Sequence, residues 1–235
     1  MASDATNDAG ALVRELREIS DRHSSWRNRQ GTEEVNGARA VEPSSSEEES
    51  QANVFLSRTN ENRDLNQYWY SKNTIETLCN AMREGLKISK GRRVAFLSTP
   101  SLYFSLSPEE KEHCAVLDYD TSWESCSGYH FYDYNYPTKI EDSLLGTFDL
   151  VVADPPFISR SVWEKYAITA RLLLKDNNSH IIATTVNENA SLMESLFGCK
   201  PALFRPSIPH LVYQYSVFTN FPSLALAVKN PELQE

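Results

Sequence analysis

The stretch F-D-L-V-V-A-D-P-P-F, residues 148–157, decides the fold of this chain. Its first part, from Phe148 to Ala153, is a short apolar run typical of a strand that is buried on both faces of a sheet. An acid and two prolines follow, and because proline fixes its own φ and carries no N–H, the strand has to end there. The stretch therefore predicts a buried strand that brings Asp154 to the carboxyl edge of a sheet.

The same pattern of short apolar runs continues along the chain. Buried strands are predicted over about 94–97, 114–117, 129–134 and 180–185. Apolar residues at helical spacing predict helices over about 72–87, 159–174 and 188–197. Strands that alternate with helices are typical of an open α/β sheet in which most strands are parallel. Two further strands, around 202–204 and 212–218, have no helix between them and predict an antiparallel hairpin at one edge.

Length and net charge limit the class of protein. The chain has 235 residues, with 23 Lys and Arg against 32 Asp and Glu, which gives a net charge of −9. This acidic balance disfavours a protein that coats nucleic acid, because phosphate binding requires a cationic surface. No run approaches the roughly 18 apolar residues of a membrane span, and the first residues do not form a secretory signal. We therefore expect a cytoplasmic protein that does not contact membranes.

The composition changes near residue 53. Residues 1–53 hold 11 acidic and 6 basic residues, and they include the run P-S-S-S-E-E-E-S at 43–50. Such a segment buries too little apolar surface to offset the entropy of ordering the chain. We therefore expect a disordered acidic N-terminal tail over 1–53 and one folded domain over 54–235. The four cysteines are far apart and form no C-x-x-C pair, so neither a disulfide scaffold nor a metal site is expected.

The D-P-P-F loop has the chemistry of a receptor for an amino group. Asp154 brings a carboxylate to the end of the strand, while Pro155 and Pro156 lack N–H groups, which leaves loop carbonyls free to face a ligand. These acceptors would hold the N–H bonds of an amine and orient the nitrogen lone pair, as methyl transfer to nitrogen requires. Phe157 offers a flat apolar face, or a cation–π contact of about 0.5–2 kcal/mol. These four residues are therefore the candidate catalytic residues.

Polar residues also follow the predicted second strand. Strand alternation predicts that Asp118 and Asp120 point the same way, and an acid at this place in dinucleotide-type folds accepts hydrogen bonds from ribose hydroxyls. The sequence does not decide which of the two acids does so. The loop at 97–101 lacks the glycines that let backbone approach a pyrophosphate, which disfavours a nicotinamide or flavin enzyme. Three consecutive aromatic residues, 68–70, could cover a cofactor or planar substrate, or could pack in the core.

Five segments, taken in order, resemble one family of class I methyltransferases. They are Q-Y-W-Y-S at 67–71 with Thr74, L-S-T-P-S-L-Y at 97–103, D-Y-D at 118–120, F-Y-D-Y-N at 131–135 and the stretch at 148–157. This family was once called putative adenine-specific DNA methyltransferases. Its members are also described as similar to N6-adenine methyltransferases. The Y-W-Y-S and Y-D-Y-N segments resemble its branch that methylates a lysine of translation elongation factor 1-alpha. The resemblance spans about residues 62–220.

This resemblance implies a Rossmann-like α/β methyltransferase domain over 54–235 that uses S-adenosylmethionine. Its sheet would have seven strands, mostly parallel, with an antiparallel C-terminal edge hairpin. The segments that border the cofactor in the family map to Tyr68, Trp69, Tyr70, Ser71, Thr99, Pro100, Asp118 or Asp120, Asp133 and Asn135. The D-P-P-F motif maps to Asp154, Pro155, Pro156 and Phe157 as the catalytic loop that binds the amine.

Three functions stay open. The favoured one is methylation of a lysine in elongation factor 1-alpha, because a carboxylate suits a cationic lysine and an acidic chain suits a basic protein partner. The second is N6 methylation of adenine in RNA or DNA, for which Phe157 and Trp69 could stack a base. Only under this function would nucleic acid be a partner. The third is a non-catalytic module that works through its tail, which an intact Asp154 and Phe157 disfavour.

Overall fold

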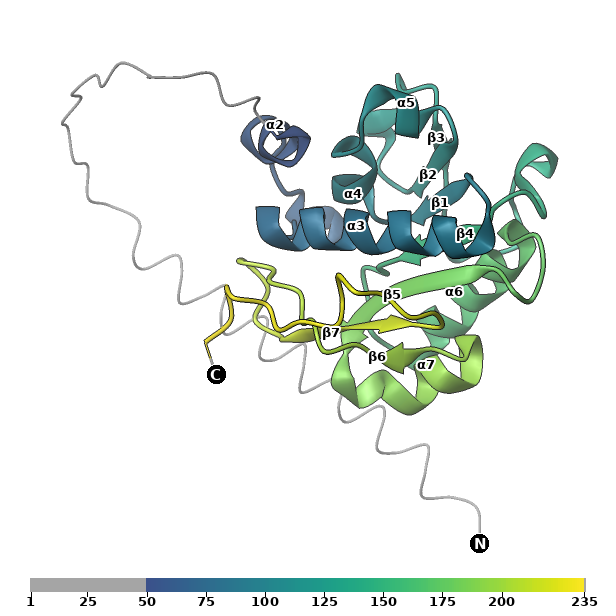
Figure 1. Cartoon of the computed structure of the whole chain (residues 1–235). Coiled ribbons are helices and arrows are strands. Elements are labelled where there is room, and N and C mark those ends of the chain that lie inside the picture. The colour runs from purple at the N-terminus through teal and green to yellow at the C-terminus, as the bar shows by residue number, and fades with distance from the viewer. Residues whose placement is uncertain (1–49, 235) are drawn as a thin grey trace, which may run out of the picture. The chain divides into compact units, whose positions relative to one another are not determined.

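The computed structural model describes residues 50–234 and contains one seven-stranded sheet, in the order β3-β2-β1-β4-β5-β7-β6 (Figure 1). The strands are β1 (Val94–Leu97), β2 (Cys114–Asp118), β3 (Tyr129–Phe131), β4 (Leu150–Ala153), β5 (His180–Val186), β6 (Lys200–Pro201) and β7 (Tyr215–Thr219). The pairs among β1 to β5 are parallel, and β7 lies antiparallel between β5 and β6. The predicted fold class is confirmed.

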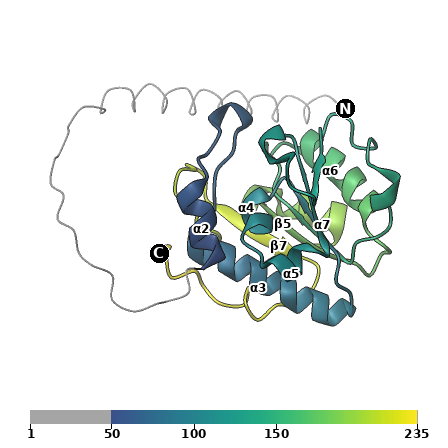
Figure 2. The same ribbon diagram turned by 90° about the horizontal axis from the view of Figure 1, so that it is seen from above.

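Helices cover both faces of this sheet. Figure 2 shows one group on one side, namely α2 (Gln51–Arg58), α3 (Lys72–Ser89), α4 (Pro100–Phe104) and α5 (Pro108–Lys111). On the other side are α6 (Arg160–Leu173) and α7 (Ala190–Phe197). Single 3₁₀ turns lie in the connections: η1 (Arg63–Leu65), η2 (Thr121–Trp123), η3 (Asp142–Leu144) and η4 (Asn187–Asn189).

The alternation of side chains along the strands divides the core into two clusters. On β1, Val94 and Phe96 pack in the cluster that includes the apolar residues of α3. Ala95 and Leu97 point to the opposite face and pack in the cluster that includes α6. Because both faces are covered, all residues of β1 and β4 are buried, which explains their unbroken apolar runs.

Local sequence sets the ends of the helices. The Ser71 hydroxyl accepts a hydrogen bond from the Thr74 N–H and caps the first turn of α3. Lys90 adopts a left-handed conformation with φ 55°, which ends the same helix. Helix α7 ends at Gly198, whose φ of 64° suits a glycine, as the sequence predicted.

The edge strands differ from the prediction in their position. β6 covers Lys200–Pro201 instead of residues around 202–204, and β7 begins at Tyr215 instead of 212. Ala202 still donates a hydrogen bond to β7, but Phe204 donates to Leu226 in the C-terminal segment. The chain therefore leaves the sheet after Ala202, and the apolar run beyond it packs against another part of the protein.

Helix α2 crosses the boundary that we expected between residues 53 and 54. Ala52 is buried, and the Phe55 ring lies 5.3 Å from the Trp69 ring in an edge-on contact. The expected N-terminal tail up to residue 49 lies outside the described residues. None of the helices that the structure describes is long and apolar enough to cross a membrane.

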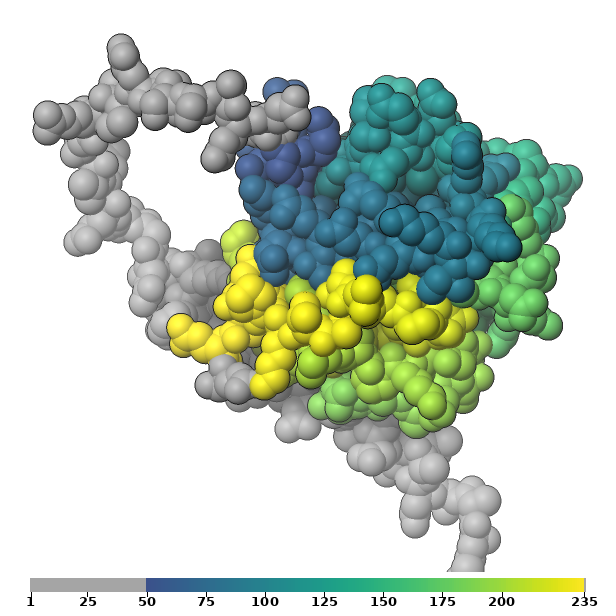
Figure 3. Space-filling view, viewed as in Figure 1, coloured from purple at the N-terminus to yellow at the C-terminus, as the bar shows by residue number. Residues whose placement is uncertain are grey.

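The segment after β7 runs along α3. The Ser223 hydroxyl donates to Glu84 over 2.6 Å, and Asn73 donates to Asn230 over 2.9 Å. Leu226 is buried in the same cluster as the apolar residues of α3. Figure 3 shows this C-terminal segment, in yellow, lying against the helix. The contacts fix α3, whose N-terminus follows the aromatic run at 68–70.

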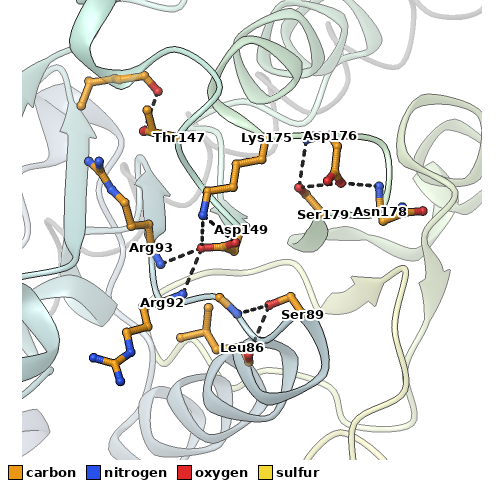
Figure 4. Close-up of polar contacts among 12 residues, drawn as sticks. Leu86, Ser89, Arg92, Arg93, Thr147, Asp149, Lys175, Asp176, Asn178 and Ser179 are labelled. Carbon is orange, nitrogen blue, oxygen red and sulfur yellow. Dashed lines mark hydrogen bonds and ion pairs between the residues drawn. The ribbon is translucent and has the colours of Figure 1, made fainter.

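A buried acid closes the amino end of β4 (Figure 4). Asp149 accepts hydrogen bonds from the N–H groups of Arg92 and Arg93, both at 3.0 Å, and from Lys175 Nζ at 2.8 Å. A Cβ at Gly91 would lie 2.0 Å from Asp149 Cγ, so the close approach requires glycine there. Burial acts to raise the pKa of Asp149, but Lys175 and the two N–H groups outweigh burial and hold the pKa below its ordinary value.

Candidate active site

A cleft of about 290 Å³ opens at the carboxyl edge of the parallel strands. Its walls come from the segment before α3, the ends of β1 to β4, helix α6 and the chain between β6 and β7. Ten of the fourteen predicted site residues line it: Tyr68, Trp69, Pro100, Asp118, Asp133, Asn135, Asp154, Pro155, Pro156 and Phe157. The other four, Tyr70, Ser71, Thr99 and Asp120, lie outside the lining, so their expected contact with a cofactor has no support from the cleft.

Asp154 follows β4 directly and faces the cleft. The Tyr70 hydroxyl donates to its Oδ2 over 2.5 Å, and the same hydroxyl lies 2.7 Å from the Thr184 hydroxyl of β5. Burial raises the pKa of Asp154 to about 7, although hydrogen bonds from Tyr70 and Thr184 act in the opposite direction. None of the ion pairs among the described residues includes Asp154. Asp154 is therefore a partly buried carboxyl that faces the cleft without a compensating cation among the described residues.

The two proline carbonyls of the loop differ in their availability. The Pro156 carbonyl accepts a hydrogen bond from the side-chain amide of Asn66, so the prediction that it faces a ligand freely is wrong. The Pro155 carbonyl accepts no hydrogen bond from the part of the chain that the structure describes. Phe157 is half exposed, and its ring centre lies 6.3 Å from that of Tyr134. The loop thus brings Asp154 and an aromatic face to the cleft.

The two acids after β2 have different surroundings. The strand ends at Asp118, so strand alternation does not reach Asp120, and the prediction that both point the same way is wrong. Asp118 lines the cleft, and burial raises its pKa to about 6. The Asp120 carboxylate instead accepts hydrogen bonds from the Ser122 N–H, at the start of η2, and from the Gln67 side chain. Asp118 is therefore the acid that the cleft offers to a ligand.

The loop after β1 makes a tight turn without glycine. Ser98 has a φ of 56°, in the left-handed region, where a residue other than glycine carries a strain of about 1–3 kcal/mol. Its hydroxyl lies 2.6 Å from the Tyr166 hydroxyl of α6, and this contact holds the turn. Pro100 lines the cleft, whereas Thr99 is buried with its hydroxyl toward the Val152 carbonyl. Strain of this kind gathers at functional sites, and here it borders the cleft.

The aromatic run at 68–70 divides between the cleft and the core. Tyr68 lines the cleft. Trp69 contributes to the lining, but it is only 7% exposed and packs against Phe55. Tyr70 is buried and contacts the acid after β4, while Ser71 caps α3. Core packing therefore explains more of this run than a cover over the cleft does.

The segment after β3 turns earlier than predicted. The strand ends at Phe131 rather than at residue 134. Asp133 accepts a hydrogen bond from the Asn135 N–H at 2.8 Å, which makes a turn and leaves both residues on the cleft wall. The Asn135 side chain in turn accepts a hydrogen bond from Lys165 of α6.

The contacts that hold the site also involve residues with no predicted role, among them Asn66, Ser98, Tyr166 and Thr184. No sequence motif marks Tyr166 or Thr184 as a site residue. They reach the site only because α6 packs on the sheet and β5 pairs with β4. Asn66 carries a weak signal, since asparagine tolerates the left-handed φ of 56° that it adopts.

A family profile described as "Probable N6-adenine methyltransferase" matches residues 61–223. EEF1A lysine methyltransferase 1 of Mus musculus is 31% identical over 169 residues, which cover 69% of this chain and 76% of the mouse protein. The chain belongs to this family of methyltransferases. Protein-lysine N-methyltransferase EFM5 of Saccharomyces cerevisiae is 32% identical over 127 residues, 51% of this chain and 50% of the yeast protein. The resemblance, the enzyme class and S-adenosylmethionine as cofactor, all expected from the sequence, are confirmed.

The fold agrees with this membership. A branched-chain polyamine synthase from Thermus thermophilus, solved with N4-aminopropylspermidine and 5'-methylthioadenosine, superposes with a TM-score of 0.51. The match covers 72% of this chain and 62% of that chain at 13% identity, so it bears on the fold alone.

The lining of the cleft fits the cofactor of this family. S-adenosylmethionine carries no phosphate and has a cationic sulfur, and the lining contains aspartates but neither Lys nor Arg among the described residues. The Asp118 carboxylate accepts a hydrogen bond from the Asp120 N–H at 2.9 Å, which leaves acceptor capacity for ribose hydroxyls. Within residues 50–234, no group of three His, Cys, Asp or Glu side chains is arranged to hold a metal ion.

Proposed function

We propose that this protein transfers a methyl group from S-adenosylmethionine to the side-chain amine of a lysine in a protein, and that this protein is translation elongation factor 1-alpha. A cytoplasmic location belongs to the same proposal, because translation factors act there. The relatives in mouse and yeast, whose names state lysine methylation, support the reaction. The mouse relative, whose name states EEF1A, supports the target.

The charge of the cleft is the observation that carries the proposal. Four aspartates line it, Asp64, Asp118, Asp133 and Asp154, and no Lys or Arg does so within the described part of the chain. A lysine side chain arrives as a cation, so this lining attracts it. A nucleic acid would bring phosphates toward the same carboxylates and would be repelled. The lining therefore favours protein lysine over adenine.

The residues of the D-P-P-F loop bind and orient the amine. A lysine ammonium has a pKa of about 10.4 in water and must release a proton to solvent before its nitrogen can attack. Asp154 and the Pro155 carbonyl accept the remaining N–H bonds, which directs the nitrogen lone pair along one axis. Phe157, half exposed, packs against the aliphatic stem of the lysine or against its charge.

The residues on the β1 and β2 side of the cleft would hold the cofactor. S-adenosylmethionine supplies an activated methyl group on its cationic sulfur. Asp118 would accept hydrogen bonds from the ribose, and the turn at Ser98 and Pro100 would form the adjoining wall. Asp120 acts indirectly, since its carboxylate holds Gln67 in the wall.

Transfer of labelled methyl from S-adenosylmethionine into a eukaryotic lysate tests the proposal. We expect label in a band of the size of elongation factor 1-alpha, lost on protease treatment and kept on nuclease treatment. Asp154→Ala should abolish the label while the protein stays folded. Label lost with nuclease would make adenine the substrate, and label in a different protein band would refute the elongation factor as target.

A further inference from the structure

One hydroxyl group contacts the Asp154 carboxyl from outside the lining of the cleft, and a second hydroxyl contacts the first. Tyr70, which precedes α3, donates to Oδ2 over 2.5 Å, and Thr184 on β5 lies 2.7 Å from the Tyr70 hydroxyl. Tyr70 is 2% exposed and Thr184 is 1% exposed, and neither lines the cleft. A ligand in the cleft therefore meets Asp154 but not the two hydroxyls.

We propose that Tyr70, directly, and Thr184, through the Tyr70 hydroxyl, are positioning residues that orient the Asp154 carboxyl and increase its anionic fraction at neutral pH, so that it can accept the N–H bonds of the substrate amine. The inference rests on the proposed role of Asp154 in amine binding. It replaces the cofactor contact that the sequence predicted for Tyr70.

The need for such a pair follows from burial. A buried carboxyl without a cation favours its neutral form, and a protonated Asp154 would donate a hydrogen bond where an acceptor is required. Burial raises the pKa of Asp154 to about 7, and hydrogen bonds from Tyr70 and Thr184 lower the pKa from the value that burial alone would give. Losing one hydroxyl would therefore leave a larger fraction of Asp154 protonated at neutral pH.

Tyr70 is a constant donor in this pair. Burial and the Asp154 charge raise the pKa of Tyr70 well above 10, so its hydroxyl keeps its proton throughout the working range. When Tyr70 donates to Asp154, its oxygen can accept from the Thr184 hydroxyl. The two hydroxyls then form one hydrogen-bonded chain that ends on Asp154 Oδ2.

The other ionisable groups around Asp154 do not replace this pair. Tyr166 of α6 and Tyr215 of β7 both interact with the Asp154 charge, and burial raises the pKa of each, so both are neutral at neutral pH. Asp118 lines the same cleft and carries the same sign of charge. Tyr70 and Thr184 are thus the side chains that favour the charged form of Asp154.

Direct titration of Asp154 tests the inference without methyl transfer. Protein labelled with ¹³C at the aspartate carboxyl is titrated by NMR with no cofactor or substrate, and Asp154→Asn assigns the resonance. We expect a midpoint near pH 7 in the natural protein and a midpoint higher by about one unit or more in Tyr70→Phe and in Thr184→Val. Asp118 serves as the internal standard and should not move. An unchanged Asp154 midpoint in both variants would overturn the inference.

Kinetics separate a positioning role from a cofactor contact. In Tyr70→Phe, the acid limb of the pH profile of kcat/KM should move to higher pH by as much as the titration midpoint does. The Kd for S-adenosylmethionine, measured by calorimetry, should stay within about twofold of that of the natural protein. A Kd weakened tenfold with an unmoved acid limb would instead assign Tyr70 to the cofactor. If the natural protein methylates no protein, the proposed function fails, and the NMR titration still decides the inference.

Two control variants separate the hydroxyl contacts from general packing. Thr184→Ser keeps a hydroxyl and should restore the midpoint that Thr184→Val loses. Tyr103→Phe removes the hydroxyl of another buried tyrosine, one whose hydroxyl lies 3.4 Å from Cys126 Sγ, and should leave the midpoint and the kinetics unchanged. A shift of the Asp154 midpoint in Tyr103→Phe equal to that in Tyr70→Phe would contradict the specific role.

Discussion

An aspartate flanks each end of strand β4, and the surroundings of the buried Asp149 and the partly buried Asp154 differ. Asp149, before the strand, pairs with the Lys175 ammonium and two backbone N–H groups, and its pKa is lowered despite burial (Figure 4). Asp154, after the strand, has hydroxyl partners and no cation, and burial raises its pKa to about 7. Burial alone therefore does not mark a functional acid. An acid is a candidate functional residue when it faces a cleft and no cation compensates the loss of its hydration.

The largest expected effect follows from removing the charge at the carboxyl end. In Asp154→Asn, kcat for methyl transfer should fall by about 10²–10³-fold or more, because the amine loses its oriented anionic acceptor. Calorimetry should show that S-adenosylmethionine still binds, since Asp154 belongs to the amine side of the cleft. Turnover close to that of the natural protein would contradict the role of Asp154.

Removing the acid at the amino end should affect folding instead. Asp149→Ala leaves the N–H groups of Arg92 and Arg93 without their acceptor, and we expect a loss of about 2–4 kcal/mol in the free energy of unfolding. Urea unfolding measures this change. The methyl-transfer rate per folded Asp149→Ala molecule should stay near that of the natural protein. A large fall in this rate would contradict the claim that Asp149 serves folding and Asp154 serves catalysis.

The two acids should also give opposite signs in the pH dependence of stability. An acid with a raised pKa in the folded state binds more protons folded than unfolded, so the contribution of Asp154 falls as the pH rises from about 4 to about 7. Asp149, with a lowered pKa, contributes stability above its unfolded pKa and loses it as the pH falls through its folded pKa. Thermal unfolding should show Asp154→Asn stabilised relative to the natural protein more at pH 8 than at pH 5. A difference that is the same at both pH values would show that Asp154 does not titrate in this range.

The smallest effect concerns the pair of acids after β2. Asp118→Asn should weaken the binding of S-adenosylmethionine by about 1–3 kcal/mol, because a charged hydrogen bond to the ribose is lost. Asp120→Asn should weaken it by less, since its carboxylate holds η2 and Gln67 rather than the ligand. Calorimetry of both variants tests the assignment of the ribose contact to Asp118. Equal losses of binding free energy in the two variants would contradict it.

Much of the fold could be predicted from the sequence. The strands β1, β2, β4 and β5 are buried on both faces, so each is an apolar run that begins and ends within about two residues of its prediction. The strand β6, at the edge of the sheet, was harder to predict from the sequence. It has only two residues, both exposed, and it is a strand only because it pairs with β7. The apolar residue Phe204 follows β6 but packs elsewhere, so hydrophobicity alone misplaced the strand.

The site was predictable where it follows strand ends, and not where it depends on contacts between distant segments. Asp154 and Asp118 face the cleft because parallel strands end at one edge of the sheet. Tyr70 and Asp154 are 84 residues apart, and Asn66 and Pro156 are 90 residues apart. Such contacts depend on how the segment before α3 packs on the sheet, which no local pattern encodes. For this reason the sequence marks Tyr70 as a site residue but does not predict its contact with Asp154.

Peptide mass spectrometry of purified elongation factor 1-alpha, incubated with S-adenosylmethionine and either the natural protein or Asp154→Asn, tests the central claim most directly. The account predicts a methylated lysine with the natural protein and none with Asp154→Asn, although both bind the cofactor. Equal lysine methylation by both proteins would contradict the claim that the acid at the carboxyl end of β4 receives the amine. No methylated lysine with either protein would contradict the proposed reaction on this target.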